Sequence, residues 1–394
     1  MMKPAICCIG YNRDKSMERL LKSIGSAYYT EKDITLIISI DESSTSDQVE
    51  RVAREFEWKY GDKIIKRYPV KLGLKQHVLS CGDLTEKYGS LIVLEDDLIV
   101  SPGFYDYAVS ALNFYANDDR IFAISLYYQT WLSNQKFIFC AEQNGSDAFL
   151  AQVSVSWGQC WIDKQWKRFR EWLNNNDMKL PTYDPRMATH AFHWNDKTSW
   201  AKYEYFYLVS NDLYHVIPYI SLTTNMGDTG SHTVFTHDRS QTPIFYGKTK
   251  KYTFYSFEYC VKYDAFFERS DETFFDTLTR TKKNNTLMDL NGIRYDWSGY
   301  KYTYSIQKLP FKSIMSFGAK LDPVELNILL DIPGNAITLY EIPDDYNSPK
   351  TFKNIKKYKT NPGRLCHYLN KIPFEQIVAN LVIRLKTRIL KRKK

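Results

Sequence analysis

The cysteines of this sequence do not form the pattern of a disulfide framework. The seven cysteines of the 394-residue chain are odd in number and irregularly spaced, with no C-x-x-C pair and no Cys/His zinc pattern. Small disulfide-stapled domains carry an even, patterned set, so that class is excluded. Cys7, Cys8 and Cys160 lie among apolar residues, and we expect them to be inert packing residues.

Long apolar runs are also missing. No stretch approaches the roughly 20 apolar residues that a membrane-spanning helix needs. The start of the chain does not show a charged segment, an apolar segment and a small-residue cleavage site in the order of a secretory signal. We therefore expect a cytoplasmic protein, attached at most peripherally to the inner face of the cell membrane.

Basic residues do not cluster, apart from residues 391–394, and the formal net charge is a modest +8. Nucleic-acid-binding domains concentrate Lys and Arg on one face, so we expect no nucleic-acid partner. Aromatic residues are abundant, with 30 Tyr, 22 Phe and 9 Trp. Rings of this kind stack on sugars as well as packing in cores.

Strand-like and helix-like segments alternate in the first third of the chain. Short apolar runs predict strands, and apolar residues at helical spacing predict helices. The expected strands are 5–10, 34–40, 64–68 and 91–94, and the expected helices are 17–27, 47–60, 74–84 and 104–115. Repeated units of this kind predict an α/β fold with a mostly parallel sheet flanked by helices.

Polar clusters follow three of these strands, at 11–13, 41–42 and 95–97. In open α/β sheets, ligands bind beyond the carboxyl ends of the strands. The three clusters therefore predict one binding site at that edge of the sheet.

The acidic cluster Glu95, Asp96 and Asp97 stands between two apolar runs. Unpaired charge is costly to desolvate, so carboxylates in this setting indicate a cleft. Mn²⁺ and Mg²⁺ take hard oxygen ligands, often one or two protein carboxylates completed by phosphate and water. A cation that bridges a diphosphate stabilises its departure. The cluster thus predicts a metal and diphosphate site, with a solvated acidic turn as the alternative.

Four further stretches complete the pattern: ISIDESS at 38–44, LGLKQHVL at 72–79, SWGQCW at 156–161 and the Gly-rich block at 218–233. With YNR at 11–13 and LIVLEDDLIVSPGFYDY at 91–107, their order resembles the GT-A glycosyltransferases. The group it is most similar to contains the Golgi N-acetylglucosaminyltransferase that begins complex N-glycans and its bacterial relatives in surface-polysaccharide assembly. The resemblance covers roughly residues 4–237.

This resemblance implies a GT-A (Rossmann-like) fold for the first part of the chain, and the sequence after it divides into two further parts. Residues 1–120 would be the nucleotide-sugar-binding half and 121–245 the acceptor-binding half. Residues 246–374 would be a C-terminal α+β extension of unknown role, and 375–394 a basic amphipathic helix.

On the nucleotide side, the resemblance places Tyr11, Asn12 and Arg13 beside the donor, with Arg13 near the diphosphate. Asp41 would meet the uracil or ribose, and His77 would lie near the base. Each has a structural alternative: Asn12 ends a strand, Asp41 is placed to cap a helix, and His77 has apolar neighbours.

On the sugar side, the resemblance implies that Glu95 and Asp96 contact the donor sugar and ribose and that Asp97 ligates the metal. Trp157 and Gly158 would line the floor of the donor-sugar and acceptor site.

A mobile loop, 227–232, would close over the donor, as its glycines permit. Asp228 and His232 lie in this loop and would contact the donor.

The general base departs from the family pattern. Many relatives have a carboxylate directly after a Trp, whereas here Trp200 is followed by Ala201. Asp196 and Glu204 are the nearest candidates for the catalytic base, with Asp228 as a third. Asp196 has an alternative role as a helix N-cap.

The last segment is amphipathic. Apolar residues recur at helical spacing from 377 to 389, and basic residues occupy 384, 386, 388 and 391–394. This pattern is typical of a helix that lies on an anionic lipid surface. Packing on the protein itself or on a second subunit is the alternative.

The sequence thus predicts a metal-dependent, inverting hexosyl- or N-acetylhexosaminyltransferase in surface-polysaccharide synthesis. It would use a nucleotide-diphosphate sugar, expected to be a UDP-sugar, and a glycan or lipid-linked oligosaccharide acceptor. Two alternatives stay open: a non-catalytic glycan-binding or scaffold protein on the same fold, and a sugar-nucleotide nucleotidyltransferase. The nucleotidyltransferase class needs a Gly-rich basic loop after the first strand, which residues 10–13 do not supply.

Overall fold

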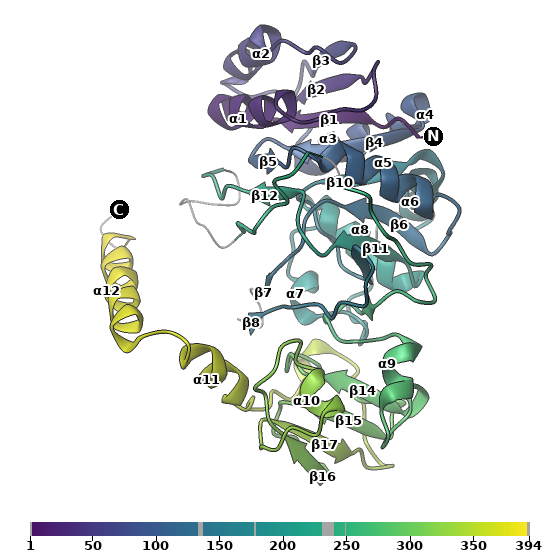
Figure 1. Cartoon of the computed structure of the whole chain (residues 1–394), viewed down its shortest axis with the longest axis vertical. Coiled ribbons are helices and arrows are strands. Elements are labelled where there is room, and N and C mark those ends of the chain that lie inside the picture. The colour runs from purple at the N-terminus through teal and green to yellow at the C-terminus, as the bar shows by residue number, and fades with distance from the viewer. Residues whose placement is uncertain (1, 133–136, 177–178, 231–239, 249, 392–394) are drawn as a thin grey trace. The chain divides into compact units, whose positions relative to one another are not determined.

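The computed structural model describes residues 2–132, 137–176, 179–230, 240–248 and 250–391 (Figure 1). The chain forms two compact units. One comprises Met1–Phe275 with Lys350–Asn354, and the other comprises Asp276–Pro349 with Ile355–Lys394.

A nine-stranded sheet forms the centre of the first unit, in the order β13-β9-β11-β6-β10-β4-β1-β2-β3. Its strands are β1 (Ala5–Gly10), β2 (Leu36–Ile40), β3 (Lys63–Arg67), β4 (Ser90–Glu95), β6 (Ile121–Ser125), β9 (Ala148–Ala151), β10 (Gln159–Ile162), β11 (Tyr214–Pro218) and β13 (Lys262–Tyr263). Five neighbouring pairs are parallel and three are antiparallel. The predicted α/β class with a mixed, mostly parallel sheet is confirmed.

Helices cover both faces of this sheet (Figure 1). The helices of this unit are α1 (Asp14–Gly25), α2 (Ser46–Glu55), α3 (Leu74–Gly82), α4 (Thr85–Tyr88), α5 (Phe104–Tyr115), α6 (Asp163–Asn175), α7 (Thr189–Phe192) and α8 (Trp200–Ser210), and α9 (Glu272–Thr277) spans its boundary with the second unit. One core contains side chains of α1, α2 and α5, and the other contains side chains of α3, α6 and α8. β1 serves both, because alternate residues of a strand point to opposite faces. Cys8 lies in the first core and Cys7 in the second.

The predicted helix 47–60 is shorter than expected. α2 ends at Glu55, because Phe56 adopts an extended conformation with φ −68° and ψ 125°. Trp58 then donates its indole N–H to the carbonyl of Ile34 at 2.8 Å. A tertiary contact therefore ends a helix that the local pattern would have continued.

A small two-stranded sheet brings a distant segment to the end of β4. β5 (Leu98–Val100) pairs antiparallel with β12 (Thr223–Asn225), so Asn225 lies opposite Leu98. The backbone N–H of Met226 donates to the carbonyl of Asp97 at 2.9 Å. A second small sheet pairs β7 (Trp131–Leu132) with β8 (Phe137–Ile138).

The second unit has its own four-stranded sheet, in the order β14-β15-β17-β16. Its elements are η1 (Lys283–Asn285), β14 (Thr286–Asp289), β15 (Tyr302–Ser305), β16 (Lys312–Phe317), α10 (Leu326–Leu329), β17 (Ile337–Glu341), α11 (Gly363–Leu369) and α12 (Phe374–Lys391). Trp297 lies at the centre of an apolar cluster in this unit. This second unit thus has a core of its own, whereas residues 246–275 of the predicted extension belong to the first unit.

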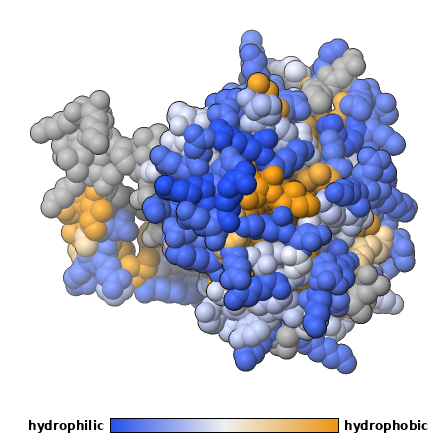
Figure 2. All heavy atoms as spheres, turned by 90° about the horizontal axis from the view of Figure 1, so that it is seen from above, coloured by the Kyte–Doolittle hydropathy of each residue, from blue (hydrophilic) through white to orange (hydrophobic). Residues whose placement is uncertain are grey.

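Apolar side chains on α12 are exposed, among them Phe374 at 74%, Leu381 at 55% and Ile383 at 63%. On the left of Figure 2, apolar residues lie at the surface of this helix. Across the described residues, no helix is long and apolar enough to cross a membrane.

Candidate active site

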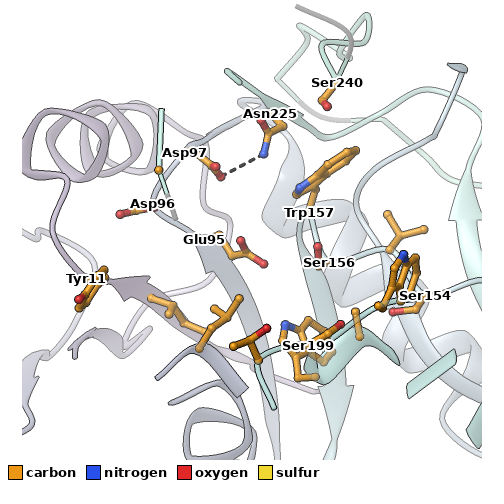
Figure 3. A pocket seen from close by; sticks show the side chains of 18 of the residues that line it. Tyr11, Glu95, Asp96, Asp97, Ser154, Ser156, Trp157, Ser199, Asn225 and Ser240 are labelled. Carbon is orange, nitrogen blue, oxygen red and sulfur yellow. Dashed lines mark hydrogen bonds between the residues drawn. The ribbon is translucent and has the colours of Figure 1, made fainter. Parts of the chain in front are cut away.

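A cavity of about 940 Å³ opens at the carboxyl ends of β1 and β4 in the first unit (Figure 3). It lies at the upper end of the roughly 300–1,000 Å³ found for small-molecule sites. Its walls come from the residues after β1 and β4, the segment before β10, the α7–α8 region and the residues after β12. The cavity is therefore at the edge of the sheet where ligands of α/β folds bind.

Ten of the fourteen residues predicted for the site line this cavity. They are Tyr11, Asn12, Arg13, Asp41, His77, Glu95, Asp96, Asp97, Trp157 and Asp228. Gly158, Asp196 and Glu204 are not among the described residues that line it. His232 lies outside the described residues.

The acidic cluster is held by one arginine. Arg13 donates from Nη1 to Asp97 Oδ2 at 3.1 Å and from Nε to Asp96 Oδ2 at 3.3 Å, with a further ion pair between Nη2 and Asp96. Asn225 donates from Nδ2 to the other oxygen of Asp97 at 3.1 Å, the bond dashed in Figure 3. Segments from three distant parts of the sequence therefore meet at these carboxylates.

The cavity floor carries more carboxyl groups than cationic side chains, and the pKa values of two of these groups are raised. Burial raises the pKa of Glu95 to about 8, and the neighbouring Asp97 and Asp96 raise it further against the opposing effect of Arg13. Burial likewise raises the pKa of Asp96 to about 6, although Arg13 acts to lower it. One arginine does not balance three carboxyl groups, so a bound cation would relieve this repulsion.

A divalent cation fits one residue of this cluster. Across the described residues, no group of three or more His, Cys, Asp or Glu side chains is arranged to hold a metal. Mn²⁺ or Mg²⁺ held by a diphosphate needs only one or two protein carboxylates. Asp97 fits this role better than Asp96, because its side chain is 14% exposed against 5% for Asp96, and Arg13 donates one hydrogen bond to Asp97 but two to Asp96.

Asp41 and His77 are engaged by the protein itself. The carboxylate of Asp41 accepts backbone N–H groups of Leu72 at 2.7 Å and Gly73 at 2.9 Å. His77 Nε2 lies 2.8 Å from the hydroxyl of Ser39. Both residues reach the cavity wall, and both also fix the segments that form it.

The two base candidates lie away from the wall. Asp196 is exposed and pairs with Lys202 at 2.5 Å. Ser199, not Asp196, caps α8, by accepting the backbone N–H of Lys202 at 3.2 Å. Glu204 is fully buried on α8. Neither carboxylate therefore reaches a cavity ligand directly in this arrangement.

The start of the predicted closing loop is attached to α1. Asp228 accepts a hydrogen bond from Ser16 at 2.7 Å and pairs with Arg19. Gly227 has a φ of 64°, a conformation that favours glycine. A Cβ on Gly230 would lie 3.0 Å from Nη1 of Arg13. The segment thus passes close to the arginine that holds the acidic cluster.

Several lining residues were not predicted from the sequence, including Asn225, Ser154 and Ser156. Asn225 ends a strand, as the predicted clusters do, and the same reasoning could have found it. Ser156 opens the SWGQCW stretch at 156–161, whereas no local pattern marks Ser154.

No protein-family model matches this sequence, and no curated protein matches it. Solved structures with a low likeness include TarS 1-349 from S. aureus in complex with UDP-GlcNAc, 8% identical over 58% of this chain and 60% of that chain, with a TM-score of 0.37. The mannosyltransferase PcManGT from Pyrobaculum calidifontis, in complex with GDP-Man and Mn²⁺, is 14% identical over 43% of this chain and 47% of that one, with a TM-score of 0.31. A cytidylyltransferase from Leptospira borgpetersenii is 12% identical over 43% of this chain and 65% of that one, with a TM-score of 0.28.

This chain covers less than two thirds of each of these proteins. Likenesses this low assign neither a family nor an activity. The function is therefore inferred from the residues that line the cavity.

Proposed function

We propose that this chain is a glycosyltransferase that moves a sugar from a nucleotide-diphosphate donor to a glycan or lipid-linked oligosaccharide. The observation that carries the proposal is the acidic cluster at the end of β4, held by Arg13 and Asn225 on the floor of a cavity of about 940 Å³. Buried carboxyl groups and an arginine at one strand end are a costly arrangement without a charged ligand.

The leaving group of such a donor is a diphosphate, whose developing negative charge must be stabilised. Arg13 can pair with phosphate in the geometry that it uses for carboxylates. Asp97 would hold Mn²⁺ or Mg²⁺, which neutralises diphosphate charge when bound. Tyr11, Asn12 and Asp41 would border the nucleotide, expected to be UDP.

The sugar and acceptor would occupy the other end of the cavity. Trp157 packs edge-on against Tyr127, with ring centroids 4.8 Å apart, and lines the wall near Glu95. Trp194 and Tyr205 add aromatic surface. An inverting displacement would place the acceptor hydroxyl opposite the departing diphosphate and would need a base there.

The proposal extends to α12 as a contact with an anionic membrane surface. Its exposed Phe374, Leu381 and Ile383 supply apolar area, and the basic residues near its end supply charge complementary to anionic lipid. A peripheral position of this kind suits a lipid-linked acceptor.

A donor panel tests the proposal. Each UDP- or GDP-sugar is incubated with the full chain and Mn²⁺, and release of the nucleoside diphosphate is measured. We expect one sugar nucleotide to release its nucleoside diphosphate faster with the chain than in the control that contains Mn²⁺ and the sugar nucleotide but no protein. Tight binding without turnover on any donor or acceptor would instead favour the glycan-binding or scaffold alternative. Formation of a sugar nucleotide from a sugar 1-phosphate and a nucleoside triphosphate would favour the nucleotidyltransferase.

A further inference from the structure

Glu204 is a fully buried carboxylate with an incomplete set of partners. On α8, its Oε2 accepts Gln159 Nε2 at 3.1 Å and the hydroxyl of Ser154. Among the described residues, its Oε1 has no hydrogen-bond partner. Buried polar atoms are normally satisfied, so an unpartnered carboxylate oxygen calls for an explanation.

The nearest titratable group is His215 on β11, also fully buried. Its Nε2 lies 3.3 Å from Glu204 Oε1. Neither ring nitrogen has a hydrogen-bond partner in the part of the chain that the structure describes, and the ring stacks on Phe122 with centroids 5.8 Å apart. Glu204 and His215 thus form a buried acid–base pair.

Ser154 connects this pair to the cavity. It lines the cavity wall, and its hydroxyl donates inward to Glu204. A serine hydroxyl has one proton to donate and two lone pairs to accept with. Because the proton points toward Glu204, the lone pairs are left for a group on the cavity side.

The position of Ser154 suits the acceptor end of the cavity. In Figure 3, Tyr11 and Ser154 lie on opposite sides, with Glu95 and Ser156 between them. If Tyr11 borders the nucleotide, Ser154 lies beyond the donor sugar.

We propose that Ser154 is the residue that takes the acceptor's proton and that Glu204 is the base behind it. The inference rests on the proposed glycosyl transfer. The acceptor oxygen forms its bond to the anomeric carbon as the bond from that carbon to the diphosphate breaks, and the bonding electrons leave with the diphosphate. The acceptor's proton moves to Ser154 Oγ, and the serine's own proton moves to Glu204 Oε2. His215 is a positioning residue that faces the other carboxylate oxygen.

Hydrolysis of the sugar nucleotide selected by the donor panel tests the relay, because water takes the acceptor's place and no glycan has to be identified. Ser154→Ala and Glu204→Gln should each lower kcat by ~10² or more, with the donor KM and UDP affinity unchanged. Ser154→Thr keeps the hydroxyl and should retain most of kcat. Ser146→Ala is the control, since Ser146 is a buried serine two residues before β9 and is not among the described residues that line the cavity.

Three results would overturn the relay while leaving the transferase proposal intact. One is full kcat in Ser154→Ala, another is full kcat in Glu204→Gln, and the third is an equal loss in the Ala and Thr variants of Ser154, which marks a packing role. If Glu204→Gln does not fold, the comparison of Ser154→Ala with Ser154→Thr decides. A wild-type chain that turns over no donor contradicts the proposed function itself, and the relay with it.

Discussion

His190 lines the cavity, and burial changes the pKa of its imidazole. Burial lowers its pKa to about 4, with a smaller contribution from His193. Its ring packs on Trp194 and Tyr205, with centroids 5.6 and 6.4 Å away. The imidazole is therefore neutral at neutral pH and serves as part of the aromatic wall.

This shift predicts a pH dependence of stability. Between the folded pKa of about 4 and the ordinary value of 6.5, the unfolded chain binds the proton and the folded chain does not. The free energy of unfolding should then fall as the pH drops through this window. The His190→Gln variant has no imidazole to take up this proton. Its Tm should therefore fall by less than the Tm of the wild type between pH 7 and pH 4.5. Equal losses in both proteins would contradict the burial of a neutral imidazole.

Asp228 attaches the start of the predicted closing loop to α1. Removing its charge in Asp228→Asn weakens the pair with Arg19, and a hydrogen bond to a charged group contributes about 1.5–3 kcal/mol. We expect donor Kd to rise by ~10-fold with Tm little changed, measured by calorimetry with UDP and the donor. Glu18→Gln is the control, because it removes a solvent-exposed ion pair of the same helix. An unchanged donor Kd in Asp228→Asn would separate this loop from donor binding.

At the scale of elements, the strands were predictable where both faces are buried. β1 occupies the predicted residues 5–10, because a strand between two cores is a continuous apolar run. The acidic cluster was predictable for the same reason, since it follows such a run.

Pairings between distant segments were not predictable. The antiparallel insertion of β10 between β4 and β6 and the pairing of β5 with β12 join residues far apart in sequence. These contacts bring in Asn225, and the contact of Ser154 with Glu204 also spans 50 positions. Local periodicity contains no information on such partners, which tertiary packing selects.

α12 carries its own prediction. Deleting residues 375–394 should abolish binding to vesicles that contain anionic lipid and leave donor hydrolysis unchanged, because the cavity belongs to the first unit. Vesicle co-sedimentation, with neutral vesicles as the control, checks this. Aggregation or unfolding of the truncated chain would show instead that the helix packs on protein.

At the scale of the whole molecule, the chain consists of two compact units, and the cavity lies in the first of them. All the described residues that line the cavity belong to the first unit, which also includes residues 350–354. Phe352 from this return packs on Phe192 and Tyr183, with ring centroids 4.5 and 5.5 Å apart. The boundaries predicted at residues 120 and 245 stay a prediction about function, since both fall inside this first unit.

In the proposed function, the acidic cluster binds a sugar nucleotide through a divalent cation at Asp97. The most direct measurement is the rate of nucleoside diphosphate release from the selected donor, against Mn²⁺ concentration, for the wild type and Asp97→Ala. We expect the wild type to lose activity in EDTA and to recover it with Mn²⁺ or Mg²⁺. The folded Asp97→Ala variant should lose nearly all turnover at every Mn²⁺ concentration. Full activity of the wild type in EDTA, or of Asp97→Ala in Mn²⁺, would contradict the account.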